Sequence, residues 1–145
     1  STNQLIKMIK KSKHLEQLQC VVINGITVAG FNVIDIARLN AKTSLPVIVI
    51  VRKKPDFKKI KHALDKINQS SKMDIINGAG EIYSLKLSGK MHLGKEIYFQ
   101  IHGIKKEDAE KIIKISATRS LVPEPIRAAH LIASGITTGK SRGRV

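Results

Sequence analysis

Aromatic side chains are scarce in this 145-residue sequence, which contains no Trp, two Tyr and three Phe. We therefore do not expect nucleic acid to bind by stacking of bases on an aromatic platform. The core must be built from Val, Ile, Leu and Ala, which suits helices packed on a mostly parallel sheet.

Cysteine is also scarce, and Cys20 is the single cysteine of the sequence. We expect Cys20 to be a buried thiol in a reducing compartment, with no disulfide inside the chain.

Long apolar runs are also lacking, since no stretch approaches the roughly 20 apolar residues that span a bilayer. Lysines interrupt the segment 5–11, which predicts an amphipathic helix rather than a secretory signal. We therefore expect a cytoplasmic protein without a membrane partner.

Acidic residues are few: 11 Asp and Glu stand against 26 Lys and Arg, which gives a formal net charge of +15. The electric field of such a positively charged protein attracts polyanions, and nucleic acid is the commonest polyanion in a cytoplasm. With few aromatic residues, the expected contacts are to phosphates or within a shaped pocket. The alternative is a lysine-rich surface that serves solubility or thermal stability and has no ligand.

Helix and strand patterns alternate along the sequence. Apolar spacing predicts a first helix that ends near residue 14 and further helices over 31–39, 57–67, 106–115 and 125–134. Apolar runs predict strands over 18–23, 46–51, 81–87 and 96–101. Asp56 is placed to cap the helix that follows it. The segment 68–80 has no clear pattern beyond a turn at its end.

This alternation predicts an α/β fold of three layers, with a mixed sheet between helices. By length it is a single domain, over residues 1–137, followed by a basic flexible tail over 138–145. Two strong and two weaker strands are few for such a sheet. We therefore expect strands of the full domain to be absent at the N-terminus.

The segment 123–130, PEPIRAAH, combines a helix start with two charges and an imidazole. Proline suits the first turn of a helix, and Arg127 and His130 then lie three residues apart on one face. A protonatable nitrogen beside a fixed positive charge suits a metal or phosphate site. The alternative is a half-buried histidine in a helix interface.

Further candidates follow the strands, where ligands bind in open α/β sheets. Asn24 and the run Arg52, Lys53, Lys54 each come directly after a predicted strand. Asn24 is either a site residue or a turn residue in a left-handed conformation before glycine. The three basic residues either hold phosphates or form a solvated face.

Three segments together resemble a known family. They are 21–36 (VVINGITVAGFNVIDI), 45–57 (LPVIVIVRKKPDF) and 123–135 (PEPIRAAHLIASG). They resemble the archaeal family called domain of unknown function ninety-nine, or UPF0215, and the match covers nearly the whole sequence. That family is in turn similar to endonuclease V, a ribonuclease-H-like nuclease that acts at deaminated bases. The resemblance implies a ribonuclease-H-like fold.

By this resemblance, His130 stands where endonuclease V has a His or Asp that helps its metal site, and Asn24 stands where it has an aspartate. The implied cofactor is Mg²⁺ or Mn²⁺, with Glu124 as the acid nearest to His130. An amide is a weak, neutral ligand for such hard cations. A second catalytic aspartate of the nuclease belongs to the first strand, which is not found here, and its catalytic glutamate has no counterpart.

We therefore expect a nucleic-acid-associated protein of endonuclease-V-like ancestry that binds rather than cleaves. Six basic residues are the expected substrate contacts: Arg52, Lys53, Lys54, Arg119, Arg127 and Arg142. The alternative is a divalent-metal-dependent endonuclease acting on DNA or RNA, with its remaining carboxylates in a missing N-terminal segment and with Asn24 and His130 as catalytic residues. The sequence leaves both enzymatic activity and the oligomeric state open.

Overall fold

The computed structural model describes residues 1–28, 30, 32–87 and 95–140 of the chain. Its centre is a four-stranded sheet with the order β1-β4-β6-β5, formed by Val21–Asn24, Val47–Val51, Lys95–His102 and Tyr83–Leu87. Strands β1 and β4 are parallel, whereas β6 is antiparallel to both β4 and β5. The predicted mixed α/β architecture is therefore confirmed.

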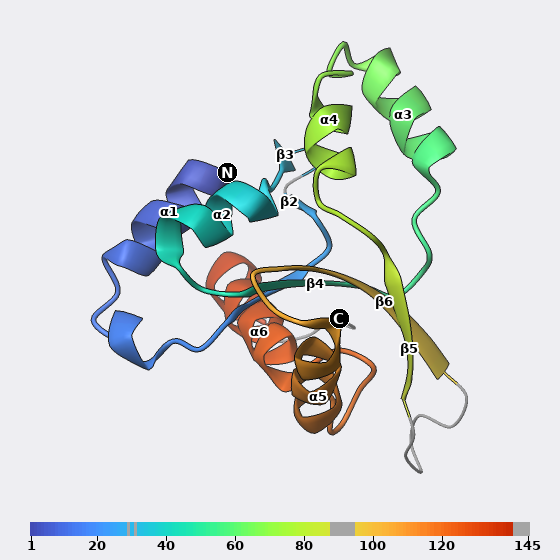
Figure 1. Cartoon of the computed structure of the whole chain (residues 1–145). Coiled ribbons are helices and arrows are strands. Elements are labelled where there is room, and N and C mark those ends of the chain that lie inside the picture. The colour runs from blue at the N-terminus through green and yellow to red at the C-terminus, as the bar shows by residue number, and fades with distance from the viewer. Residues whose placement is uncertain (29, 31, 88–94, 141–145) are drawn as a thin grey trace.

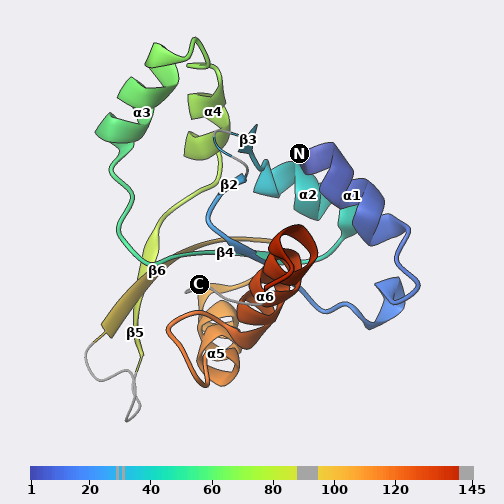
Figure 2. The same cartoon turned by 180° about the vertical axis from the view of Figure 1, so that it is seen from behind.

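Helices cover both faces of this sheet (Figures 1 and 2). One face packs against α1 (Thr2–Lys10) and α2 (Ile36–Thr43), and the other against α5 (Lys106–Ser116) and α6 (Glu124–Thr138). A short 3-10 helix, η1 (Leu15–Gln17), joins α1 to β1. In β4, Val47 and Val49 belong to the core on the α2 side, and Ile48 and Ile50 to the core on the α5 side. All four are fully buried, as an unbroken apolar run predicts for a strand covered on both faces.

Two further helices, α3 (Phe57–Lys66) and α4 (Lys72–Asn77), form an arm that projects from the end of the sheet (Figure 1). Oδ1 of Asp56 accepts hydrogen bonds from the backbone N–H groups of Lys58 and Lys59, both at 3.1 Å, so the predicted cap of α3 is confirmed. Leu64, Ile76 and Val33 form a small apolar cluster at the base of the arm.

The segment between β1 and α2 differs from the prediction. The helix expected over 31–39 is wrong in its first part, because β2 (Thr27–Val28) and β3 (Asn32–Val33) pair as an antiparallel hairpin. The helix begins only at Ile36, where Oδ1 of Asp35 accepts a 2.8 Å hydrogen bond from the backbone N–H of Arg38. An aspartate cap thus sets this helix start more strongly than the apolar spacing before it.

The last helix, α6, runs to Thr138 and so extends beyond its predicted end at residue 134. Gly139 ends it in the left-handed conformation, with a φ of 69°. Residues 141–145 of the predicted tail lie outside the described residues. None of the described helices is long and apolar enough to cross a bilayer.

Candidate functional site

A cavity of about 360 Å³ lies where the parallel strands β1 and β4 end. This is the edge of an open α/β sheet at which ligands bind, and the volume falls within the range of small-ligand pockets. The lining comes from the exit of β1, the β2–β3 hairpin, the residues after β4, the α3–α4 arm and the middle of β6. Segments distant in sequence therefore meet at one place.

Most of the cavity wall is apolar. Ile26 and Val33 contribute from the hairpin, Ile60 and Leu64 from α3, and Ile76 from α4. Leu64 is fully buried, and its packing against Val33 and Ile76 holds the arm against the hairpin. The shape of the cavity thus depends on the position of the arm.

The rim of the cavity is basic. Arg52, Lys53 and Lys54 leave the sheet directly after β4 and are exposed, and the two lysines line the cavity whereas Arg52 does not. The pKa of the nearby Glu96 carboxyl is lowered, first by a 2.8 Å hydrogen bond from the Tyr98 hydroxyl and to a smaller extent by Lys54. The predicted basic run therefore stands at the edge of a cavity.

Asn24 is the last residue of β1 and is exposed. The left-handed conformation considered for Asn24 belongs instead to Gly25, which has a φ of 77° and lines the cavity. The Gly25 N–H donates to the Ile50 carbonyl at 2.8 Å, which keeps this turn tied to β4. Asn24 therefore directly precedes the cavity-lining Gly25 in the sequence but does not line the cavity itself.

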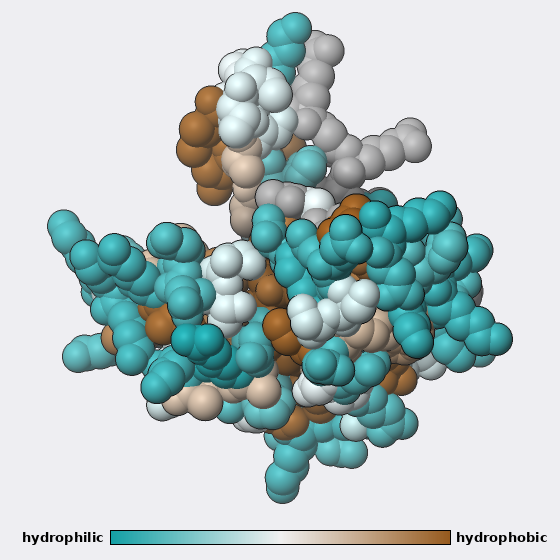
Figure 3. All heavy atoms as spheres, turned by 90° about the horizontal axis from the view of Figure 1, so that it is seen from above, coloured by the Kyte–Doolittle hydropathy of each residue, from teal (hydrophilic) through white to brown (hydrophobic). Residues whose placement is uncertain are grey.

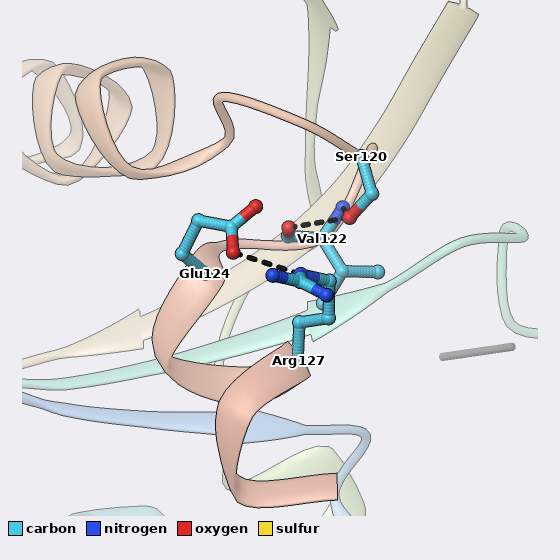
Figure 4. Close-up of polar contacts among 4 residues, drawn as sticks. All are labelled: Ser120, Val122, Glu124 and Arg127. Atoms are coloured by element: carbon cyan, nitrogen blue, oxygen red, sulfur yellow. Dashed lines mark hydrogen bonds and ion pairs between the residues drawn. The ribbon is translucent and has the colours of Figure 1, made fainter. Parts of the chain in front are cut away.

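At the start of α6, Glu124 and Arg127 point toward each other (Figure 4). Nε of Arg127 donates to Oε2 of Glu124 at 2.8 Å, and this hydrogen bond is the main reason that the pKa of Glu124 is lowered. Arg119 lowers it further through its charge and its backbone N–H. Oε1 of Glu124 is enclosed and lacks a partner with hydrogen-bond geometry. The structure thus brings Arg119, Glu124 and Arg127 together as one charged group.

His130 is exposed, one turn further along α6, and this helix contacts β1, the strand that ends at Asn24. Within residues 1–28, 30, 32–87 and 95–140, no group of three His, Cys, Asp or Glu side chains is arranged to hold a metal ion. The metal set Asn24, Glu124 and His130 therefore stays a prediction. Arg142 lies outside the described residues.

Gln100 is a cavity residue that sequence reasoning missed. It lies in β6 opposite Val49, is 4% exposed, and lines the cavity. Its Nε2 donates to the Gly80 carbonyl at 3.0 Å. The available signal was an amide within an otherwise apolar stretch, 97–101, of a predicted strand. An uncharged polar side chain in such a place needs a buried partner.

Comparison with known proteins agrees with this architecture. A family model described as "Endonuclease dU" matches residues 1–137. A UPF0215 protein of Methanothermobacter thermautotrophicus is 44% identical over 99% of this chain and 68% of its own length. A UPF0215 protein of Methanosarcina mazei is 47% identical over 99% of this chain and 72% of its own length.

A solved structure shows the same fold. It is the crystal structure of an Archaeoglobus fulgidus protein of unknown function, with a TM-score of 0.83 and 38% sequence identity, covering 96% of this chain and 76% of that protein. The family predicted from the three sequence segments is confirmed by these matches. The chain therefore belongs to the endonuclease dU family, together with the archaeal UPF0215 proteins.

Proposed function

We propose that this protein binds nucleic acid at the strand-end cavity, with a single base in the apolar cavity and the adjoining phosphates on the basic rim. The observation that carries the proposal is the position of Lys53 and Lys54 on the rim of a mostly apolar cavity. Apolar walls suit the faces of a base, and exposed ammonium groups suit phosphate oxygens.

Charge around the arm supports phosphate contacts. Residues 52–66 contain seven Lys or Arg and two Asp. One aspartate, Asp56, already accepts the capping hydrogen bonds of α3. Seen from above, the side of the molecule that carries α3 is largely hydrophilic (Figure 3). A basic surface that continues from the cavity onto α3 would bind a strand on either side of the held base.

The finer proposal for the fold is a ribonuclease-H-like domain of endonuclease-V-like ancestry. Strand β1 is at the edge of the described sheet. The N–H groups of Val21 and Gly25 donate to Pro46 and Ile50 of the neighbouring strand segment, both at 2.8 Å. Since alternate N–H groups of a strand point to opposite sides, the N–H of Val22 points away from β4 and can pair with another strand. A larger sheet of the ribonuclease H type would extend from this edge.

A second candidate is a divalent-metal-dependent nuclease. The contact between α6 and β1 favours it, because it joins the helix of His130 to the strand of Asn24. In such nucleases the metal ions stabilise both the attacking and the leaving oxygen of the phosphodiester. Carboxylates from residues other than Asn24 and His130 would have to hold these ions. Cleavage of an oligonucleotide by this chain with Mn²⁺, abolished by His130→Ala, would favour the nuclease.

The main proposal is tested by the salt dependence of binding to a fluorescent oligonucleotide. Phosphate contacts release counterions, so the logarithm of the affinity should fall linearly with the logarithm of the salt concentration. An affinity that does not respond to salt would contradict binding through phosphates.

A further inference from the structure

We infer that a second cavity binds a phosphate group, with the guanidinium of Arg38 as its main ligand. This polar cavity has a volume of about 260 Å³ and meets the strand-end cavity at Val33, which lines both. The inference rests on the proposed function in one respect, since we assign the phosphate to the strand whose base occupies the strand-end cavity. The phosphate site itself stands on the residues of the polar cavity.

The walls of the polar cavity come from the start of α1, from β3 and the first turn of α2, and from the start of α4. The start of the chain, β3 and α4 lie close together in both views (Figures 1 and 2). The Asp35 N–H donates to Oγ1 of Thr2 at 3.0 Å, which ties α1 to the start of α2. Packing between Val33 of β3 and Ile76 of α4 holds the helix of Lys72 against the hairpin. Hydrogen bonding and core packing therefore set the positions of these walls.

The lining of the polar cavity is positively charged. Among the described residues that line it, six of seven are polar or charged and none is acidic. Arg38 contributes from α2 and Lys72 from α4, so cations from separate helices line one space. Lys53 and Lys54 do not line this cavity, and neither Arg38 nor Lys72 lines the strand-end cavity. The two cavities therefore have separate sets of cations.

The guanidinium of Arg38 is available to a ligand. Arg38 is exposed, and its side chain forms no hydrogen bond or ion pair with any residue that the structure describes. The nearest carboxylate in sequence, that of Asp35, accepts the backbone N–H of Arg38 at 2.8 Å and caps α2. Because this cap uses the backbone, the guanidinium keeps all of its N–H donors.

The donors of the polar cavity match the chemistry of a phosphate. A guanidinium binds two phosphate oxygens at once through its planar fork of N–H groups, which an ammonium group cannot do. The Thr2 hydroxyl accepts the Asp35 N–H, so its own O–H remains to donate to a ligand. A hydroxyl donor and two cations in one cavity suit an oxyanion rather than the apolar faces of a base.

The position beside the strand-end cavity makes the phosphate site part of a longer path for a strand. A nucleotide within a strand has a phosphate on each side of its sugar. Lys53 and Lys54 can bind one of these phosphates and the polar cavity the other, because the two linings meet at Val33. A base held in the strand-end cavity would then be fixed from both directions along the strand.

Titration with inorganic phosphate tests the site without any nucleic acid. In proton–nitrogen NMR spectra at constant ionic strength, the Nε–H signal of Arg38, assigned by its loss in Arg38→Gln, should shift saturably with phosphate and not with chloride. This variant keeps the backbone N–H that Asp35 accepts, so the cap of α2 is retained. Followed through the backbone signals of Thr2 and Asn3, it should bind phosphate at least about tenfold more weakly, the loss expected for hydrogen bonds to a charged group.

Two further variants separate the guanidinium from the net charge. Arg38→Lys keeps the charge but loses the fork, so it should bind phosphate more weakly than the wild type. Arg52→Gln removes the same charge from an exposed residue that lines neither cavity, and it should bind phosphate as the wild type does. An equal shift of the Arg38 signal with chloride, or an equal loss of binding in Arg52→Gln and Arg38→Gln, would overturn the phosphate site.

A fluorescent single-stranded oligonucleotide distinguishes the phosphate site from the proposed function. Arg38→Gln should lower the salt slope of its binding by about 0.7, the contribution of one phosphate contact. An unchanged slope would overturn the assignment of the phosphate to the strand, and saturable binding of inorganic phosphate would then identify a site for free phosphate groups. Phosphate binding by a protein that binds no oligonucleotide would reject the proposed function and support the phosphate site. Oligonucleotide binding with no phosphate shift at Arg38 would do the reverse.

Discussion

Replacing Lys53 and Lys54 by glutamine removes the two charges on the cavity rim without shortening either side chain greatly. Both residues are exposed and line the cavity, and neither forms an ion pair within the described part of the chain. If each ammonium group neutralises one phosphate, the double variant loses two counterion-releasing contacts. The change should therefore appear in the salt dependence of binding and not only in the affinity.

The expected magnitude follows from the number of contacts. Each phosphate contact contributes about 0.7 to the slope of log affinity against log salt on a single strand and about 0.9 on duplex DNA. Two contacts should lower the slope by about 1.4 to 1.8. Between 50 and 200 mM salt, the advantage of the wild type over the variant should shrink by about 7- to 12-fold.

Fluorescence anisotropy with a labelled oligonucleotide at several salt concentrations measures both slopes. The matched control is the Lys10→Gln, Lys11→Gln double variant, which loses the same charge from exposed positions at the end of α1, away from the cavity lining. If both variants change the slope equally, nucleic acid is attracted by the net charge of +15 as a whole, and the lysines of the cavity rim contribute no more than other lysines do. An unchanged slope in the rim variant would refute the phosphate contacts.

Three further substitutions test the structure around the site. Arg127 holds the pKa of Glu124 below its ordinary value of 4.5, so the ionised carboxylate stabilises the fold at neutral pH and loses that effect as the pH falls below 4.5. In the Glu124→Gln variant, the urea concentration at the unfolding midpoint should therefore fall less between neutral and acid pH than in the wild type. Leu64→Ala should lower the free energy of unfolding by about 2–5 kcal/mol and weaken oligonucleotide binding, because the arm loses its central packing residue. Gly103→Ala should cost more than about 1 kcal/mol in urea unfolding, because φ is 73° and the new Cβ would collide with a neighbouring side-chain amide, whereas Gly139→Ala, left-handed but in open space, should cost less.

The parts of the fold that local signals determine could be predicted from the sequence. The unbroken run of β4 predicts a strand covered on both faces, and its residues Val47 to Ile50 are indeed fully buried. Asp56 predicts the start of α3 because a carboxylate at this position satisfies free N–H groups of the first turn. For α3, the capping side chain lies within a few residues of the N–H groups that it satisfies. For β4, the apolar run itself indicates that both faces of the strand are buried.

Elements that depend on distant contacts could not be predicted in this way. Strands β2 and β3 have two residues each, which is too short for an alternating pattern to appear. Helix α4 has six residues, and isolated helices of that length are not stable in water. Val33 of β3 and Ile76 of α4 both pack on Leu64, so each element is held by the same small cluster. A tertiary cluster is not visible in local spacing.

The candidate site shows the same division. The basic run after β4 could be placed at a strand end from the sequence, and the structure puts Lys53 and Lys54 on the cavity rim. Gln100 could not be recognised, because its significance comes from the Gly80 carbonyl twenty residues earlier in the chain and from a cavity shared with the arm. A single polar residue in a strand acquires a role only when its partner and its surroundings are known.

The segment at the start of α6 leads to the opposite conclusion. Its sequence places Glu124, Arg127 and His130 at helical spacing, which first suggests a shared metal or phosphate site. The same i, i+3 spacing lets Glu124 and Arg127 neutralise each other, and they do so at 2.8 Å. Because each charge already neutralises the other, Glu124 attracts a cation and Arg127 attracts a phosphate less strongly than an unpaired group would. By contrast, Lys53 and Lys54 at the rim of the strand-end cavity form no ion pair with any residue that the structure describes, so the cavity rather than α6 is where an anionic ligand is expected to bind first.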